Sequence, residues 1–342
     1  MAARSAQIWQ WLCMGLAVPV LLAAVCAAAQ AAAAAEAVAG AGVGASGQPA
    51  VRALAVRPGL YMLTVAGENA ALQTGPDGVL IVDTGPASGS AALLAAIRKI
   101  TAKPIRYIIN TSASADRVGG NERVAEAGDA FTGVLGTDAP IIAQQNVLLT
   151  MTHTPRGGTA IYHTEAALPS LTYGGRQKNL YLNGEGIEVI AAPAAHSDGD
   201  SVVLFRGSDV LVAGDLIDMT RFPVIDTAHG GTIQGEIDAL NRLLDAAIPL
   251  SPVIWQSGGT IVIPGRGRLG EQEEIVQYRD MVTIMRDRIR DLIDHGRTLA
   301  QIQAADPTDG YDVRYGADSG DWTTRQFVEA VYESLMAARN KR

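Results

Sequence analysis

The stretch from residue 59 to residue 85 constrains the fold more than any other part of this 342-residue chain. Three β-rich runs follow one another there, GLYMLTV, AALQT and VLIVDTG, and only the short turns AGEN and GPDG separate them. Glycine-containing turns between runs of this kind are typical of β-hairpins. The sequence therefore predicts strands joined by tight turns at the start of the folded part.

Downstream of this stretch, strand-like and helix-like segments are mixed. Strands are expected at residues 106–110, 179–184, 186–193, 201–207, 209–215 and 260–265. Apolar residues spaced by three and four predict helices at 88–100, 234–247, 271–295 and 323–339. Strands in hairpins mixed with helical crossovers indicate a layered α/β domain, and the last helices indicate a helical tail.

Residues 1–35 have the layout of a secretory signal peptide: an arginine near the start, the apolar run WLCMGLAVPVLLAAVCAAA, and then small residues. A membrane anchor is the first alternative, but the apolar run is short and contains Pro19. A lipid anchor on Cys26 is the second, but the bulky Val25 precedes it. We therefore expect cleavage, a secreted or periplasmic protein that is not held by a membrane, and a flexible Ala/Gly linker over residues 36–52.

Both cysteines, Cys13 and Cys26, lie inside the predicted signal peptide. The cleaved chain would then have no disulfide, no thiolate zinc ligand and no cysteine nucleophile. The formal net charge is −8, and no basic run occurs. An acidic chain of this kind is a poor binder of nucleic acid, so a small molecule is the expected partner.

Four predicted loops share one feature, since each follows a strand and combines polar residues with glycine. They are SASADRVGGN at 112–121, AAHSDGDS at 194–201, AGDLID at 213–218 and PGRGRLG at 264–270. Catalytic and binding side chains concentrate in loops that a rigid scaffold positions. These four loops are therefore the candidate functional site.

The order of these motifs, together with the VLIVDTG strand, resembles the metallo-β-lactamase superfamily over residues 59–270. The resemblance implies an αββα sandwich of two mixed sheets flanked by helices, here at residues 53–275. It also implies a hydrolase lineage and a centre of two zinc ions around a bridging hydroxide. Residues 276–342 would then form a C-terminal helical extension.

The chain departs from the family at most of the metal-ligand positions. The first family loop reads H-x-H-x-D-H, and the residues at those places here are Ser112, Ser114, Asp116 and Arg117. The last family histidine is replaced by Arg266. A serine hydroxyl is a poor zinc ligand at neutral pH, whereas arginine offers no lone pair and stays protonated.

Three ligand positions keep a competent residue, and the resemblance assigns them to Asp116, His196 and Asp215. Catalytic zinc normally has three protein ligands, but two guanidiniums beside these groups would repel a divalent cation. We therefore expect no cofactor. A single, weakly held zinc ion on the three residual ligands is the alternative.

Charge balance indicates what replaces the metal. Asp116 and Asp215 would repel each other without a cation between them. Arg117 and Arg266 can neutralise both carboxylates through forked hydrogen bonds. We predict an Arg117–Asp116–Asp215–Arg266 cluster that forms a ligand-binding cleft with the two loop serines. The alternative is that both arginines lie at the surface.

Asp116 and His229 are the catalytic candidates. His229, in DTAHGG, follows the AGDLID loop and is expected to reach the same cleft, where it would act as a base or orient a substrate. Ser112 or Ser114 would be a nucleophile only with a histidine in hydrogen-bond reach. No G-x-S-x-G elbow, the mark of many serine hydrolases, occurs in the sequence.

Three functions remain open. The first is an exported protein of hydrolase lineage that has lost dinuclear zinc catalysis and binds a small ligand, an anion included, in the cleft. The second is an active hydrolase of an ester, amide or lactone with one weakly held metal or none. The third is a structural role, in which the helical extension covers the cleft or forms a homodimer. The first is preferred, because the residues do not support zinc chemistry.

Overall fold

The computed structural model describes residues 50–131, 137–153, 164–249 and 258–340. The predicted signal peptide at 1–35 and residues 36–49 of the predicted linker lie outside these ranges. The first strand begins at Arg52, so folded structure starts at the last residue of the predicted linker. No helix in the described ranges combines the length and the apolar character that a membrane span requires.

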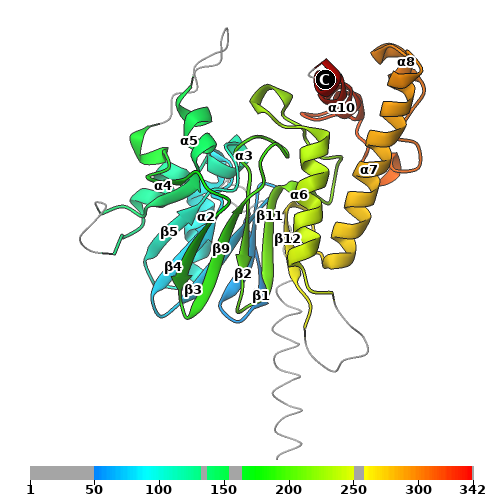
Figure 1. Ribbon diagram of the computed structural model, residues 1–342. Helices are drawn as coiled ribbons and strands as arrows, with labels where there is room; N and C mark the ends of the chain where they lie inside the picture. Colours follow the sequence, from blue (N-terminus) through cyan, green and yellow to red (C-terminus); the bar gives the residue numbers. More distant parts are fainter. Residues whose placement is uncertain (1–49, 132–136, 154–163, 250–257, 341–342) are drawn as a thin grey trace, which may run out of the picture. The chain divides into compact units, whose positions relative to one another are not determined.

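The N-terminal half of the fold is a mixed sheet (Figure 1). The predicted hairpins are confirmed, since β2 (Leu60–Val65), β3 (Glu68–Gly75) and β4 (Gly78–Val82) are antiparallel neighbours. β1 (Arg52–Arg57) pairs with β2. On the other side, β5 (Ile105–Ile109), β6 (Ile141–Gln144) and β7 (Leu171–Tyr173) continue from β4 in parallel.

The C-terminal half contains β8 (Gln177–Leu182), β9 (Glu185–Ala191), β10 (Ser201–Phe205) and β11 (Val210–Asp218), which pair in antiparallel order. β12 (Ile261–Arg266) pairs with β11 in parallel. β12 also meets β3 at one residue pair, where Arg266 lies opposite Glu68. This pair joins the two halves at the edge that carries the candidate site.

The two halves bury their inner faces against each other. Leu80 and Ile109 from the first half belong to the same buried cluster as Val203, Phe205 and Ile263 from the second. Alternate side chains of a strand point to opposite faces, so the outer faces of both halves need a second cover. Helices provide it.

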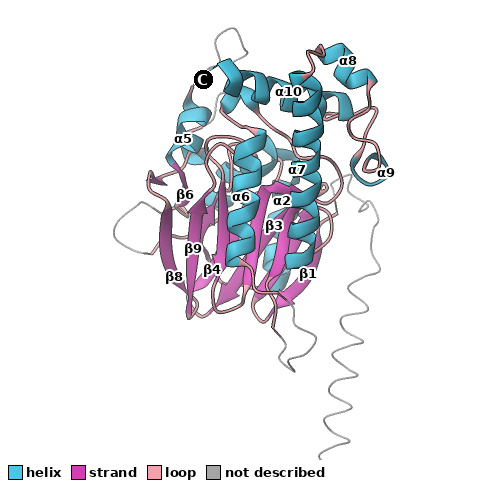
Figure 2. Ribbon diagram, turned by 45° about the vertical axis from the view of Figure 1, so that its right-hand side comes forward, coloured by secondary structure: helices cyan, strands magenta, loops and turns pink. Residues whose placement is uncertain are grey.

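The layers are therefore helix, sheet, sheet and helix, as the sequence predicts. α2 (Ser90–Ile100) and α4 (Asn121–Glu126) pack on the first half and bury Leu93, Ile97 and Val124. α6 (Ile233–Ala246) and α7 (Gln272–Asp294) lie side by side over the second half (Figure 2).

The C-terminal helices share the core of the second half. After α7 come α8 (Leu299–Ala304), α9 (Asp312–Tyr315) and α10 (Thr324–Asn340). Phe327 of α10 stacks on Phe222 with ring centroids 4.7 Å apart, and both belong to the buried cluster that contains Ile275 and Tyr278 of α7. The boundary predicted between residues 275 and 276 thus falls inside a continuous helix, and the helical extension has no separate core.

Candidate functional site

The four predicted loops meet at one edge of the sandwich, beside α3 (Figure 1). Ser112 hydrogen-bonds Asp215, Asp215 lies next to His196, and Arg266 contacts Asp116.

The short elements of the fold are η1 (Ala87–Gly89), α3 (Ala115–Val118), α5 (Gln145–Thr152), η2 (Glu165–Ala167) and η3 (Thr227–His229).

Hydrogen bonds from the end of β4 fix the first loop. Asp83 accepts from the backbone nitrogen of Thr111 at 2.8 Å and from its hydroxyl at 2.7 Å. Thr84 donates to the carbonyl of Arg117 from its backbone nitrogen at 2.9 Å and from its hydroxyl at 3.0 Å. α3 is therefore held against the sheet, and the side chain of Arg117 is directed inward.

Arg117 is buried, with 2% of its side chain exposed, and the protein itself uses its donors. Nε donates to Asp215 Oδ1 at 2.7 Å, and Nη2 donates to Glu68 Oε2 at 2.9 Å. Nη1 donates to the carbonyls of Asn69 and Gly265, each at 3.3 Å. A Cβ at position 265 would lie 2.6 Å from Nη2, so glycine there makes room for the guanidinium. Four of the five N–H donors are thereby engaged.

Arg266 completes the arrangement from β12. Its Nη2 contacts Glu68 and lies 2.7 Å from Asp116 Oδ2, and its Nε lies 3.7 Å from Asp218 Oδ2. Glu68 therefore bridges Arg117 and Arg266. The sequence does not point to Glu68, because the AGEN motif reads as a hairpin turn, whereas in the structure Glu68 is the first residue of β3 and its pairing with β12 brings it to the site.

Arg221 extends this group through ion pairs to Asp218 and Asp321. We call the whole group the arginine network, and its members are Arg117, Arg221, Arg266, Glu68, Asp116, Asp215, Asp218 and Asp321. It contains all four residues of the predicted cluster, and in it Arg117 pairs with Asp215 and Arg266 with Asp116. The alternative that both arginines lie at the surface is wrong. Three guanidiniums face five carboxylates, so the network has no positive excess to attract an anion.

Burial and neighbouring charged groups determine the pKa values of the side chains in the network. Burial disfavours the carboxylate of Asp215, but Arg117 and His196 outweigh burial and lower its pKa. Burial also disfavours the guanidinium of Arg117, yet the carboxylates of Asp215 and Asp83 raise its pKa, so it stays protonated. Burial raises the pKa of Glu68 to about 7 despite the two arginines.

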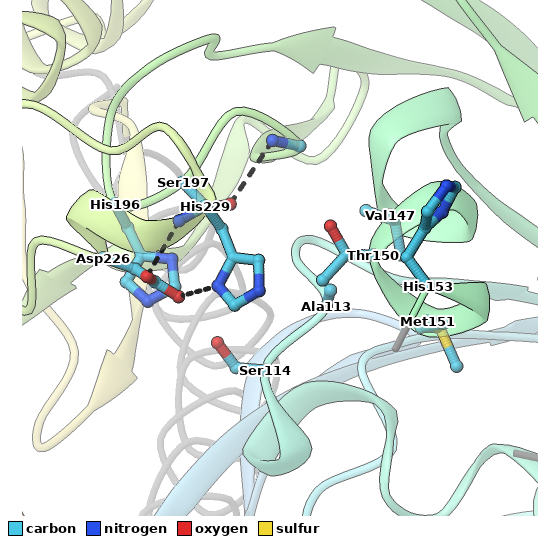
Figure 3. A pocket seen from close by; sticks show the side chains of 11 residues that line it. Ala113, Ser114, Val147, Thr150, Met151, His153, His196, Ser197, Asp226 and His229 are labelled. Atoms are coloured by element: carbon cyan, nitrogen blue, oxygen red, sulfur yellow. Dashed lines mark hydrogen bonds and ion pairs between the residues drawn. The ribbon is translucent and has the colours of Figure 1, made fainter. Parts of the chain in front are cut away.

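A pocket of about 210 Å³ opens at the same edge of the fold (Figure 3). Val147 and Met151 of α5 give it an apolar wall, and Ser114, His196 and His229 contribute polar groups. Three of the eight predicted site residues thus line the pocket. The other five lie outside its lining and belong to the arginine network or contact it: Ser112, Asp116, Arg117, Asp215 and Arg266.

His196 borders both the pocket and the network. Asp200 accepts hydrogen bonds from the backbone nitrogen and hydroxyl of Ser197 at 2.6 and 2.8 Å, and lies 3.3 Å from His196 Nδ1. Asp215 Oδ2 lies 4.0 Å from the same nitrogen. Burial alone would lower the pKa of His196, but Asp200 and Asp215 raise it to about 9. The ring is therefore an imidazolium at neutral pH.

His229 and Asp226 form a hydrogen-bonded pair at the pocket. His229 Nδ1 lies 2.6 Å from Asp226 Oδ2, and the other carboxylate oxygen accepts from the backbone nitrogen of His229 at 3.1 Å. The carboxylate can only accept, so Nδ1 carries a proton, and in the neutral ring Nε2 offers the lone pair. In Figure 3 the ring lies between Asp226 and the side chains of α5. The sequence indicates His229 but not Asp226, although a carboxylate three residues before a histidine in a turn is a usable signal.

Glu236 of α6 is a second buried acid near His196. It is fully buried, and neither carboxyl oxygen has a hydrogen-bond partner in the described part of the chain. Burial raises its pKa well above the usual value, and Asp200 adds to the effect.

Comparison with known proteins identifies the family of this fold. The family model described as the metallo-beta-lactamase superfamily matches residues 63–250, which is more than half of the chain. The chain belongs to the metallo-β-lactamase superfamily. The resemblance expected from the motifs is thereby confirmed. No curated protein matches this superfamily member in a sequence comparison.

Solved structures share the fold of this superfamily member at low sequence identity. A metallo-beta-lactamase from Pontibacter korlensis has a TM-score of 0.52 at 16% identity, over 68% of this chain and 99% of that one. The DIM-1 metallo-beta-lactamase has a TM-score of 0.52 at 16% identity, over 69% and 98%. The sec-alkylsulfatase Pisa1 from Pseudomonas sp. has a TM-score of 0.58 at 16% identity, over 83% and 50%. Identity this low shows the fold alone.

The residues of this superfamily member do not fit two zinc ions. Within the described ranges, no group of three or more His, Cys, Asp or Glu side chains is placed to hold a metal ion. Of the three residual ligands, Asp116 and Asp215 are paired with arginines, and His196 directs Nδ1 toward Asp200. The donor set is that of an ion-pair network.

Proposed function

We propose that this superfamily member works without the dinuclear zinc centre and binds a small, neutral molecule in the pocket between α5 and His229. One observation carries the proposal: the guanidinium of Arg117 lies between Asp215 and Glu68, at 2.7 and 2.9 Å. Two unit charges about 4 Å apart interact by about 4 kcal/mol at an effective dielectric constant of about 20, and a divalent ion would feel about twice that repulsion.

The pocket, rather than the arginine network, is the proposed binding site. The donors of Arg117 are engaged by carboxylates and carbonyls, whereas the Ser114 hydroxyl has no hydrogen-bond partner in the described residues. An apolar cavity of about 150 Å³ holds benzene, so a pocket of about 210 Å³ suits a ligand of roughly ten non-hydrogen atoms.

The charges near the pocket favour a neutral ligand over the anion that the sequence allows. Carboxylates outnumber guanidiniums in the arginine network, and Asp226 lines the pocket itself. The imidazolium of His196 is already compensated by Asp200 and Asp215. The carboxylates would therefore repel an anionic ligand.

Zinc binding tests the loss of the metal centre. We expect the purified protein, dialysed against zinc and then against buffer, to retain less than about 0.1 zinc per chain by elemental analysis. As a positive control, a variant with Ser112→His, Ser114→His, Arg117→His and Arg266→His regains the family pattern and should retain zinc. Two zinc ions per chain in the unaltered protein would overturn the proposal.

Ligand binding is tested separately with acetophenone, a neutral probe of nine non-hydrogen atoms. We expect resonances of the α5 wall, Val147 and Met151, to shift on titration. 4-Acetylbenzoate, which differs by one carboxylate, should bind at least about tenfold more weakly, because about 1.4 kcal/mol of charge repulsion suffices for that factor. Equal or tighter binding of the carboxylate would contradict a neutral ligand.

The place of this function in the cell remains a proposal from the sequence. We propose export by the signal peptide at residues 1–35 and a secreted or periplasmic protein that uses no nucleic acid or membrane as partner. A homodimer through the C-terminal helices remains the alternative use of the extension. Fractionation of the expressing cells, with and without residues 1–35, tests the location.

A further inference from the structure

We infer that the pocket hydrolyses small neutral esters without a metal ion, with His229 as the general base and Asp226 as its positioning residue. The inference rests on the proposed function, because it needs a pocket free of metal that accepts a neutral molecule. Beyond binding, it assigns a reaction, ester hydrolysis, and a substrate class, small neutral esters. It also assigns a role to Asp226, which the sequence does not indicate.

The geometry of the His229–Asp226 pair carries the inference. The 2.6 Å contact between His229 Nδ1 and Asp226 Oδ2 fixes the ring and its tautomer, and the carboxylate can stabilise the imidazolium that forms during proton transfer. The side chain of His229 is 40% exposed and lines the pocket, so Nε2 can reach a bound water or substrate. A histidine held in this way meets the requirements of a general base.

Water is the nucleophile in this scheme. Ser112 donates its hydroxyl to Asp215 at 2.6 Å, and in the described part of the chain neither Ser112 nor Ser114 is hydrogen-bonded to a histidine. A serine nucleophile requires such a base within hydrogen-bond reach. His229 therefore acts on a water molecule in the pocket.

The reaction balances with these groups alone. The water oxygen bonds to the ester carbonyl carbon, and one water proton passes to His229 Nε2. When the tetrahedral intermediate collapses, the bond from carbon to the leaving oxygen breaks, and Nε2 returns the proton to that oxygen. The products are a carboxylic acid and an alcohol, and His229 and Asp226 end in their initial states.

One group at the pocket can stabilise the negative charge on the carbonyl oxygen. The Ser114 hydroxyl lines the pocket and is available as a donor. Donors that are already in place lower the cost of forming an oxyanion.

Phenyl acetate, a neutral ester of ten non-hydrogen atoms, is the probe, and EDTA is present throughout. We expect turnover above the buffer rate. His229→Gln should lower kcat by about 10²-fold or more, the usual contribution of a general base. Asp226→Asn should lower kcat by about tenfold with KM unchanged, and added imidazole should restore part of the rate of His229→Ala.

The matched control is His295→Gln. His295 lies at the end of α7 in a similar pair, 3.6 Å from Asp291, but its side chain is 70% exposed and it does not line the pocket. This variant should keep kcat within about twofold. A rate for His229→Gln equal to that of the unaltered protein would overturn the inference, as would the absence of imidazole rescue.

Failure of the inference and failure of the proposed function give different results. If acetophenone binds but phenyl acetate is not hydrolysed, the inferred ester hydrolysis is wrong, and the proposed binding function is retained. If neither compound binds, the proposal that the pocket binds a neutral molecule is wrong as well. If EDTA abolishes hydrolysis and zinc restores it, the metal-free centre itself is wrong.

Discussion

The arginine network and the pocket lie at the same edge of the sandwich and meet at His196, but they differ in how their polar groups are used. In the network, Arg117 is buried and directs four N–H donors at protein oxygens. In the pocket, the Ser114 hydroxyl and one nitrogen of His229 have no hydrogen-bond partner among the described residues. A saturated network stabilises the fold, whereas unsatisfied donors and acceptors next to a cavity recognise a molecule. The charges at the former metal-ligand positions therefore do not coincide with the proposed binding site.

Removal of a network charge should have the largest effect. Arg117→Met leaves Glu68 and Asp215 without their buried partner, so we expect the free energy of unfolding to fall by about 3–5 kcal/mol. Urea denaturation measures the change. The matched control is Arg206→Met, whose ion pair with Glu188 involves a side chain that is 64% exposed and should contribute less than about 1 kcal/mol. Equal losses in the two variants would show that the network is not a buried structural unit.

Deprotonation of His196 should have the next largest effect on the stability of the fold. Its pKa in the folded protein is raised from 6.5 to about 9, so the stability that it contributes is fully present below pH 6.5 and is lost as pH rises through 9. The destabilisation caused by His196→Gln should therefore be larger at pH 6 than at pH 10, by at most about 3 kcal/mol. Thermal unfolding of both proteins across this range measures it. A destabilisation that does not change with pH would mean that the ring is neutral.

The smallest effect is expected at Glu236, which lies near the junction of the two regions. Its buried carboxyl group has no hydrogen-bond partner in the described residues, so Glu236→Leu should raise the free energy of unfolding by about 1–2 kcal/mol. Glu236→Gln is the control, because it keeps a buried polar group and should give no gain. A marked loss of stability in the leucine variant would indicate that a bound water or a ligand uses this acid.

Regular patterns made the fold predictable from the sequence. The strands from residue 59 to residue 85 and the long helices at 234–247 and 271–295 have clear turns or clear helical spacing, and all are present. β6, with four residues, and β7, with three, were too short to show a period. Such strands form because neighbouring strands pair with them.

The candidate site was predictable in its loops but not in all its contacts. The exchange of ligand histidines for Ser112, Arg117 and Arg266 can be read from the sequence, and charge balance then predicts that the arginines meet carboxylates. Glu68 could not be found in this way, because it precedes Arg117 by 49 residues and belongs to a motif that reads as a turn in the sequence. Sheet register, not local sequence, places it between the arginines.

The sequence by itself determined the strand and helix pattern, the family resemblance and the loss of most metal-ligating side chains, since these depend on residue type and short-range spacing. The tertiary structure decided which carboxylate each guanidinium contacts, that Arg117 is closed to ligands, and that His229 and Asp226 face a cavity. Those properties depend on distances between atoms from different strands and loops, and packing alone sets these distances.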